Sequence, residues 1–153
     1  MTNTVDARLA DLGLTLPDAP APAANYVPYV KTGNQIYVSG QLPAGPDGLV
    51  TGKLGDDLET EAGAEAAKYC AIALLSQARK AADGDLERVR LVKLVGFVNS
   101  TADYPDQPKV INGASDLMVA VLGDKGRHAR SAVSAASLPF NVAVEIEAIF
   151  EIS

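Results

Sequence analysis

Residues 141–152, NVAVEIEAIFEI, decide the fold class because apolar side chains recur along them at every second position. Every even-numbered position is apolar, whereas Glu145 and Glu147 occupy the other parity. A period of two over this length is typical of a β-strand that buries one face. The small residues of segment 131–136 are also compatible with a strand, so we predict a β-hairpin whose turn contains Pro139.

Two charged residues of this predicted hairpin are candidates for a functional site. Arg130 lies where the hairpin begins, and Glu145 lies in its second strand. At the rigid end of a sheet, the guanidinium could bind a carboxylate while the glutamate positions a water molecule. The alternative is a structural pair between neighbouring strands, which contributes little to stability when exposed. Residue types alone favour the structural pair.

The composition predicts one domain in a reducing compartment. The 153 residues are 48% apolar, enough for a core, and charged residues interrupt each apolar stretch before it reaches membrane-spanning length. Asp6 and Arg8 make the N-terminus unlike a signal peptide. Cys70 has no disulfide partner, and one cysteine and one histidine are too few for a zinc site. We therefore expect a cytoplasmic protein without metal, cofactor or membrane contact.

The net charge argues against nucleic acid as a partner. The chain has 13 basic and 19 acidic residues, which gives a formal net charge of −6. A general nucleic-acid binder needs a basic stripe to neutralise phosphates. The basic clusters at 88–93 and 125–130 are short and interleaved with acidic or apolar residues. A local pocket could still hold a small anion.

The remaining patterns predict an α+β domain behind an N-terminal extension. Residues 2–13 place Val5, Leu9 and Leu12 on one face of a short predicted helix. The Pro/Ala-rich segment 16–24 is typical of an extended arm. We therefore divide the chain into a helix and arm, residues 1–25, and a domain, residues 26–153. In the domain we expect a mixed sheet with two helices packed on one face, built from strands 26–31, 35–39 and 89–99, helices 58–82 and 107–122, and the final hairpin. The glycine-rich segment 43–55 lacks the residues of a phosphate-binding loop and is predicted to be a surface loop.

Strand 89–99 is apolar on both faces. Strict alternation places Val89, Leu91, Val95 and Phe97 on one face and Val92, Leu94, Gly96 and Val98 on the other. Such a strand must be covered on both sides, and the two helices cover only one. We expect a second copy of the chain to cover the other face, with a long loop of the same domain as the alternative.

Five short motifs resemble those of the Rid (YjgF) family of enamine/imine deaminases. In chain order they are Ser39-Gly40-Gln41-Leu42-Pro43, Val110-Ile111-Asn112, Ala129-Arg130-Ser131, Leu138-Pro139 and Glu145-Ile146-Glu147-Ala148-Ile149. The similarity covers about residues 26–152, and the combination of motifs is specific although each one alone is weak. The resemblance implies a chorismate-mutase-like α+β fold and a homotrimer with ligand clefts between subunits. It also implies hydrolysis of 2-enamines and 2-imines, such as 2-aminoacrylate, to 2-keto acids and ammonia.

The resemblance further implies roles for individual residues. Arg130 is expected to hold the substrate carboxylate, and Glu145 to orient the attacking water or exchange protons with the substrate. With the motifs around them, the functional interpretation of this pair becomes the favoured one. The other substrate-binding positions implied by the family pattern are Tyr26, Ser39, Gly40 and Asn112, with Tyr29 as a competitor for the tyrosine position.

Two positions depart from the family pattern. His128 stands where many members have proline, and Ala132 stands where many have cysteine, which excludes thiol chemistry at that position. Both changes suggest a divergent subgroup with an altered cleft. They leave open a related enzyme with another carboxylated substrate, such as an aminomuconate-type deaminase or a chorismate-mutase-like isomerase. A non-enzymatic protein that binds small acids is the further alternative.

Overall fold

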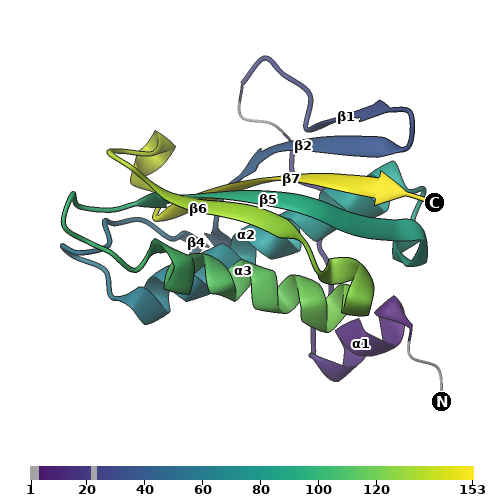
Figure 1. Cartoon of the computed structure of the whole chain (residues 1–153), viewed down its shortest axis with the longest axis horizontal. Coiled ribbons are helices and arrows are strands. Elements are labelled where there is room, and N and C mark those ends of the chain that lie inside the picture. The colour runs from purple at the N-terminus through teal and green to yellow at the C-terminus, as the bar shows by residue number, and fades with distance from the viewer. Residues whose placement is uncertain (1–3, 22–23) are drawn as a thin grey trace.

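A mixed sheet with two long helices on one face forms the body of the chain (Figure 1). The computed structural model describes residues 4–21 and 24–153. Its elements are α1 (Val5–Asp11), β1 (Tyr29–Thr32), β2 (Gln35–Gln41), β3 (Ala44–Gly45), β4 (Gly48–Leu49), α2 (Thr60–Ala81), β5 (Val89–Asn99), α3 (Gln107–Leu122), β6 (Ala129–Ala135) and β7 (Val144–Ile152). The predicted α+β class, the mixed sheet and the packing of both helices on one face are confirmed.

The order of the strands corrects the predicted hairpin. The main sheet runs β1-β2-β7-β5-β6, so β5 lies between the two strands that were expected to pair. β6 is parallel to β5, whereas β5, β7, β2 and β1 pair in antiparallel fashion. Alternation identifies the last strand correctly, but it carries no information about which strand is its partner. β6 is consequently an edge strand.

β5 contains an irregularity that interrupts its alternation. Its pairing with β7 shifts register between Leu91 and Lys93, which places an extra residue at Val92. Leu91 and Leu94 are therefore both fully buried on the helix side. The prediction that Leu91 shares a face with Val95 and Phe97 is wrong. After the extra residue, each side chain of β5 points to the face opposite to the one that strict alternation from Leu91 predicts.

The sheet face opposite the helices, the open face, carries apolar side chains that no other part of the described chain covers. Val30, Tyr37 and Ile149 form one row across β1, β2 and β7, and Val133 is paired with Phe97 of β5. Val30 is 53% exposed, and Tyr37 and Val133 are each 44% exposed. A face of this kind is typical of a surface that associates with another protein.

The two long helices bury stripes of mostly small side chains against the sheet. The residues predicted to face the sheet are buried in α3, and in α2 all except the half-buried Tyr69 are. Cys70 is fully buried, and its burial raises the pKa of the thiol well above the ordinary value, with the charge of Glu145 as a smaller cause. This agrees with a packed, unreactive cysteine. Among the described residues, no helix is long and apolar enough to cross a membrane.

The N-terminal helix packs on the domain through a narrower face than predicted. Thr4 caps α1 by accepting a hydrogen bond from Ala7 N through its side chain. Val5 and Leu9 are buried, but Leu12 is 45% exposed. The helix ends at Asp11, so Leu12 lies beyond the last turn and does not extend the buried face.

The arm that follows lies along α2. Arg79 donates to Leu16 O at 3.1 Å, and Gln77 Nε2 donates to Pro20 O at 2.8 Å. These bonds tie extended backbone to a helix that belongs to the main body. The predicted arm also includes residues 22 and 23, which lie outside the described residues, and the division at residue 25 stays a prediction.

The glycine-rich segment 43–55 is more than a surface loop. It contains the short β3–β4 hairpin, and its Leu54 is fully buried in the core. Lys53 Nζ donates to Asn99 Oδ1 and to Ala136 O, each at 2.6 Å. The prediction of a surface excursion is wrong for this second half, because a cation and a leucine anchor it to the end of β5.

Candidate functional site

Arg130 lies on edge strand β6, and its guanidinium points toward α3. Its Cα pairs with that of Leu94, which is fully buried, so the arginine lies on the helix-covered side of the sheet. Nη1 donates to Ser115 Oγ at 3.1 Å, and Nη2 donates to Pro108 O at 3.3 Å. Among the described residues it forms no ion pair with a carboxylate. The guanidinium has five N–H donors, and the described part of the chain supplies acceptors for two of them, which leaves three for a ligand.

An open polar cavity of about 280 Å³ lies beside this guanidinium. Asn112 and Ser115 are neighbours on one face of α3, since they are three positions apart in the helix. The structure therefore brings Arg130 together with Asn112, as the sequence predicts. The lining residues are Asn112, Ser115, Asp116, Val119, Arg127, His128 and Arg130. We call Arg130, Asn112, Ser115 and His128 the arginine group.

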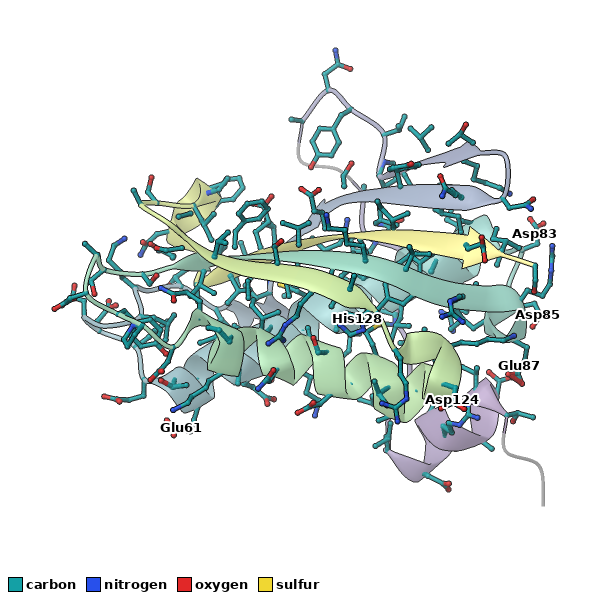
Figure 2. The ribbon with its side chains drawn as sticks, in the orientation of Figure 1. Glu61, Asp83, Asp85, Glu87, Asp124 and His128 are labelled. Atoms are coloured by element: carbon teal, nitrogen blue, oxygen red, sulfur yellow. The ribbon has the colours of Figure 1, made fainter. Side chains whose placement is uncertain are left out.

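Ser115 is a member of the arginine group that could not be predicted from the sequence. Its hydroxyl accepts from Arg130 Nη1 and lies 2.9 Å from His128 Nε2. Ser115 lies in α3 close to Asn112, but a single serine on a helix surface carries no functional signal by itself. His128, which departs from the family pattern, lies between β6 and α3 in Figure 2.

Glu145 lies on the open face of the sheet. Its Cα pairs with that of Phe97, which is itself paired with Val133, and all three side chains share that face. The carboxylate packs directly on Gly40, where a Cβ atom would collide with Glu145 Oε2. The absence of a Cβ atom at Gly40 permits this close approach in the observed rotamer of Glu145. The predicted site residues Gly40 and Glu145 are thus in contact.

The environment of Glu145 raises the pKa of its carboxyl group above the ordinary value of 4.5. The larger cause is burial, which disfavours the charged form, and the second is the negative charge of Glu147. A carboxyl group whose pKa moves toward neutrality is better suited to exchange protons near neutral pH. This feature agrees with a role in proton transfer.

Tyr26 and Ser39 lie close to Gly40. Ser39 Oγ donates to Val27 O at 3.1 Å, and Tyr26 lines a second cavity of about 190 Å³ together with Gly40. Tyr29, the competing tyrosine, is half-buried and packs against the core from β1. Of the two tyrosines, Tyr26 is therefore the one that faces a cavity next to a predicted site residue. We call Glu145, Gly40, Ser39 and Tyr26 the glutamate group.

A single chain does not bring Arg130 and Glu145 together. Arg130 shares its face with Leu94, and Glu145 shares its face with Phe97, three residues further along the same strand. Because side chains alternate along a strand, the two lie on opposite faces of the sheet. β5 also separates their strands, so the expected alternative of an ion pair between neighbouring strands is wrong as well. The sequence could not reveal this arrangement without the strand order.

The variant Glu145→Gln should become more stable than wild type as the pH rises, and the difference between the two should grow with pH. A raised pKa in the folded state means that folding favours the protonated carboxyl group. The contribution of Glu145 to stability is therefore greatest below pH 4.5 and is lost as the pH rises through the folded-state pKa. Glutamine removes this loss. The melting temperatures of wild type and Glu145→Gln are measured from pH 4 to pH 8. A difference that stays constant over this range, or that shrinks with rising pH, would contradict the burial of an ionised Glu145.

Comparison with known proteins gives the relatives of the chain. Residues 6–151 match the family model described as "YjgF/chorismate_mutase-like, putative endoribonuclease". Protein TCP17 of Trypanosoma cruzi is 51% identical over 152 residues, which cover 97% of this chain and 94% of TCP17. The crystal structure of Atu1372 from Agrobacterium tumefaciens, a protein with unknown function, has a TM-score of 0.90 at 48% identity and covers 99% of this chain and 95% of that one. RidA from an Antarctic Psychrobacter has a TM-score of 0.59 at 30% identity and covers 88% and 94%.

Proposed function

Because the chain belongs to the YjgF/Rid family, we propose that it hydrolyses 2-enamines and 2-imines such as 2-aminoacrylate to 2-keto acids and ammonia. The observation that carries the proposal is the guanidinium of Arg130, which borders an open polar cavity and has no carboxylate partner among the described residues. An arginine held in this way suits a small carboxylate, because its planar donors match two carboxylate oxygens.

The active site is proposed to form between subunits of a homotrimer. Arg130 and Glu145 lie on opposite sides of one sheet, so a single chain cannot offer both to one small substrate. Association through the apolar open face would place the glutamate group of one subunit against a neighbouring subunit. If the neighbour presents its β6 edge there, its Arg130 completes the site.

The chemistry requires little beyond positioning. An enamine such as 2-aminoacrylate takes up a proton at its terminal carbon to give the 2-imine, and water then adds to the imine carbon. The resulting carbinolamine loses ammonia and leaves the 2-keto acid. Arg130 would fix the carboxylate, while Glu145 would orient the water and exchange protons. Ala132 leaves no thiol in the strand for a covalent intermediate.

The direct test generates 2-aminoacrylate with a pyridoxal-phosphate-dependent serine dehydratase and follows pyruvate release. We expect the protein to accelerate release above the spontaneous rate in proportion to its concentration. Sedimentation equilibrium of the same sample should give three times the mass of one chain. Absence of acceleration would refute the deaminase proposal. Binding of pyruvate without turnover would then identify a protein that only binds small acids.

Two further outcomes separate the remaining candidates. Turnover of a larger carboxylated enamine in place of 2-aminoacrylate would favour an aminomuconate-type deaminase, in which Arg130 would bind the same chemical group. The endoribonuclease named in the family model is less well supported for this chain. A formal net charge of −6 provides no basic footprint for RNA, so we expect no retention of a 20-nucleotide RNA at low salt.

A further inference from the structure

A directed chain of hydrogen bonds runs from the short 3₁₀ helix Gly123–Gly126, which follows α3, to the guanidinium of Arg130. His128 Nδ1 lies 2.6 Å from Gly126 O, which can only accept, so Nδ1 carries a proton. In the neutral ring, Nε2 is then an acceptor, and Ser115 Oγ at 2.9 Å must donate to it. The hydroxyl oxygen of Ser115 is left with its lone pairs free to accept from Arg130 Nη1 at 3.1 Å. Each partner therefore fixes the orientation of the next.

We propose that Ser115 and His128 are positioning residues that hold the guanidinium of Arg130 in the orientation that binds the substrate carboxylate. This inference rests on the proposed function and adds two residues to it. Pro108 O holds Nη2 at 3.3 Å while Ser115 holds Nη1, so both terminal nitrogens have a fixed partner. The remaining N–H groups are left for the ligand. Neither Ser115 nor His128 needs to touch the substrate.

Two features distinguish this arrangement from ordinary surface hydrogen bonding. An arginine on an edge strand has several rotatable bonds, and holding it in one orientation before the ligand arrives removes part of the entropic penalty of binding. In addition, Ser115, His128 and Arg130 all line the same cavity as Asn112. The other two charged residues that line this cavity, Arg127 and Asp116, are less suited to orient Arg130. Arg127 Nε lies 3.4 Å from Asp124 Oδ1, and Asp116 makes no ion pair with Arg130 among the described residues.

The test compares loss and conservative variants at both positions in the intact protein. Ser115→Ala and His128→Ala should each raise KM for 2-aminoacrylate by about tenfold, with kcat changed less than about twofold. Ser115→Thr keeps the hydroxyl and His128→Gln keeps an acceptor toward it, so both should stay near wild type. Because the two residues act in series, the double variant Ser115→Ala/His128→Ala should be no worse than either single one.

The matched control is Ser76→Ala on α2, a helical serine that lies outside both groups and whose hydroxyl, within residues 4–21 and 24–153, donates only to Ile72 O of its own helix. It should leave KM unchanged. The positioning role is overturned if Ser115→Ala keeps the wild-type KM while Arg130→Ala loses activity, or if the double variant shows the product of the single effects. A fall in kcat alone would overturn it as well.

A second readout, the binding of pyruvate, tests the positioning role of Ser115 and His128 even if the protein is not a deaminase. If wild type shows no deamination, the same variants are compared by calorimetric titration with pyruvate, and the same tenfold weakening is expected in Kd. A wild type that binds pyruvate without turnover then refutes the deaminase and still tests the positioning pair. A wild type that neither turns over 2-aminoacrylate nor binds pyruvate overturns both, because Arg130 would then have no small carboxylate to hold.

Discussion

Arg130→Ala is expected to lower kcat/KM for 2-aminoacrylate by about two orders of magnitude. A charge-assisted bidentate interaction with a carboxylate is worth on the order of 3 kcal/mol, and each 1.4 kcal/mol corresponds to about tenfold. The guanidinium already has its two terminal nitrogens held by Ser115 and Pro108. Its loss therefore removes a preorganised anion site and not a flexible surface charge. Steady-state kinetics of pyruvate release measure the effect.

Two further variants show whether the geometry of the donor group matters. Arg130→Lys keeps the charge but offers a point donor in place of a planar fork, so we expect it to recover only part of the lost activity. Arg88→Ala removes the same charge at a distant position, where Nε donates to Ser153 O, and should leave the kinetics unchanged. Wild-type kinetics in Arg130→Ala, with the fold intact by melting temperature, would refute the role of this residue in substrate binding.

Local patterns predicted most elements because each one depends on neighbouring residues. The helix at Gln107–Leu122 and the strand at Val89–Asn99 have the predicted bounds. The partner of each strand depends on segments far away in the sequence, and for this reason the hairpin between β6 and β7 was predicted wrongly. The extra residue at Val92 could not be predicted either, because apolar residues occur on both faces of this strand and their pattern does not reveal a bulge.

The candidate site could also be predicted only in part: its residues follow from local motifs, but their arrangement in space does not. Motifs located Arg130, Asn112, Gly40 and Glu145, and the structure places the first two at one cavity and the last two in contact. What the sequence could not supply is the relation between these pairs. Whether two residues share a sheet face depends on strand order and register, and both are tertiary properties. Ser115 was missed because its role exists only through the arginine that it contacts.

Gly113→Ala is expected to destabilise the protein by about 2–3 kcal/mol and to lower the melting temperature by roughly 5–10 °C. α2 and α3 approach so closely at Gly113 that a Cβ atom would overlap Ala64 O and lie 2.8 Å from Ala64 C. Both are backbone atoms, which a rotamer change cannot move. Alanine favours a helix over glycine by about 1 kcal/mol, so this gain is too small to offset separation of the helices.

Gly63→Ala on the facing helix is the matched control for this effect. There a new Cβ would meet only side-chain atoms, Leu54 Cδ1 at 3.0 Å and Val110 Cγ2 at 3.1 Å, which can adjust by small rotations. We expect a change within about 1 kcal/mol of wild type, because the gain in helix propensity offsets the crowding. Equal melting temperatures for the two variants would show that the backbones are not in contact at Gly113. Because Gly113 lies between Asn112 and Ser115, the helix separation should also displace the arginine group, so Gly113→Ala should raise KM while Gly63→Ala should not.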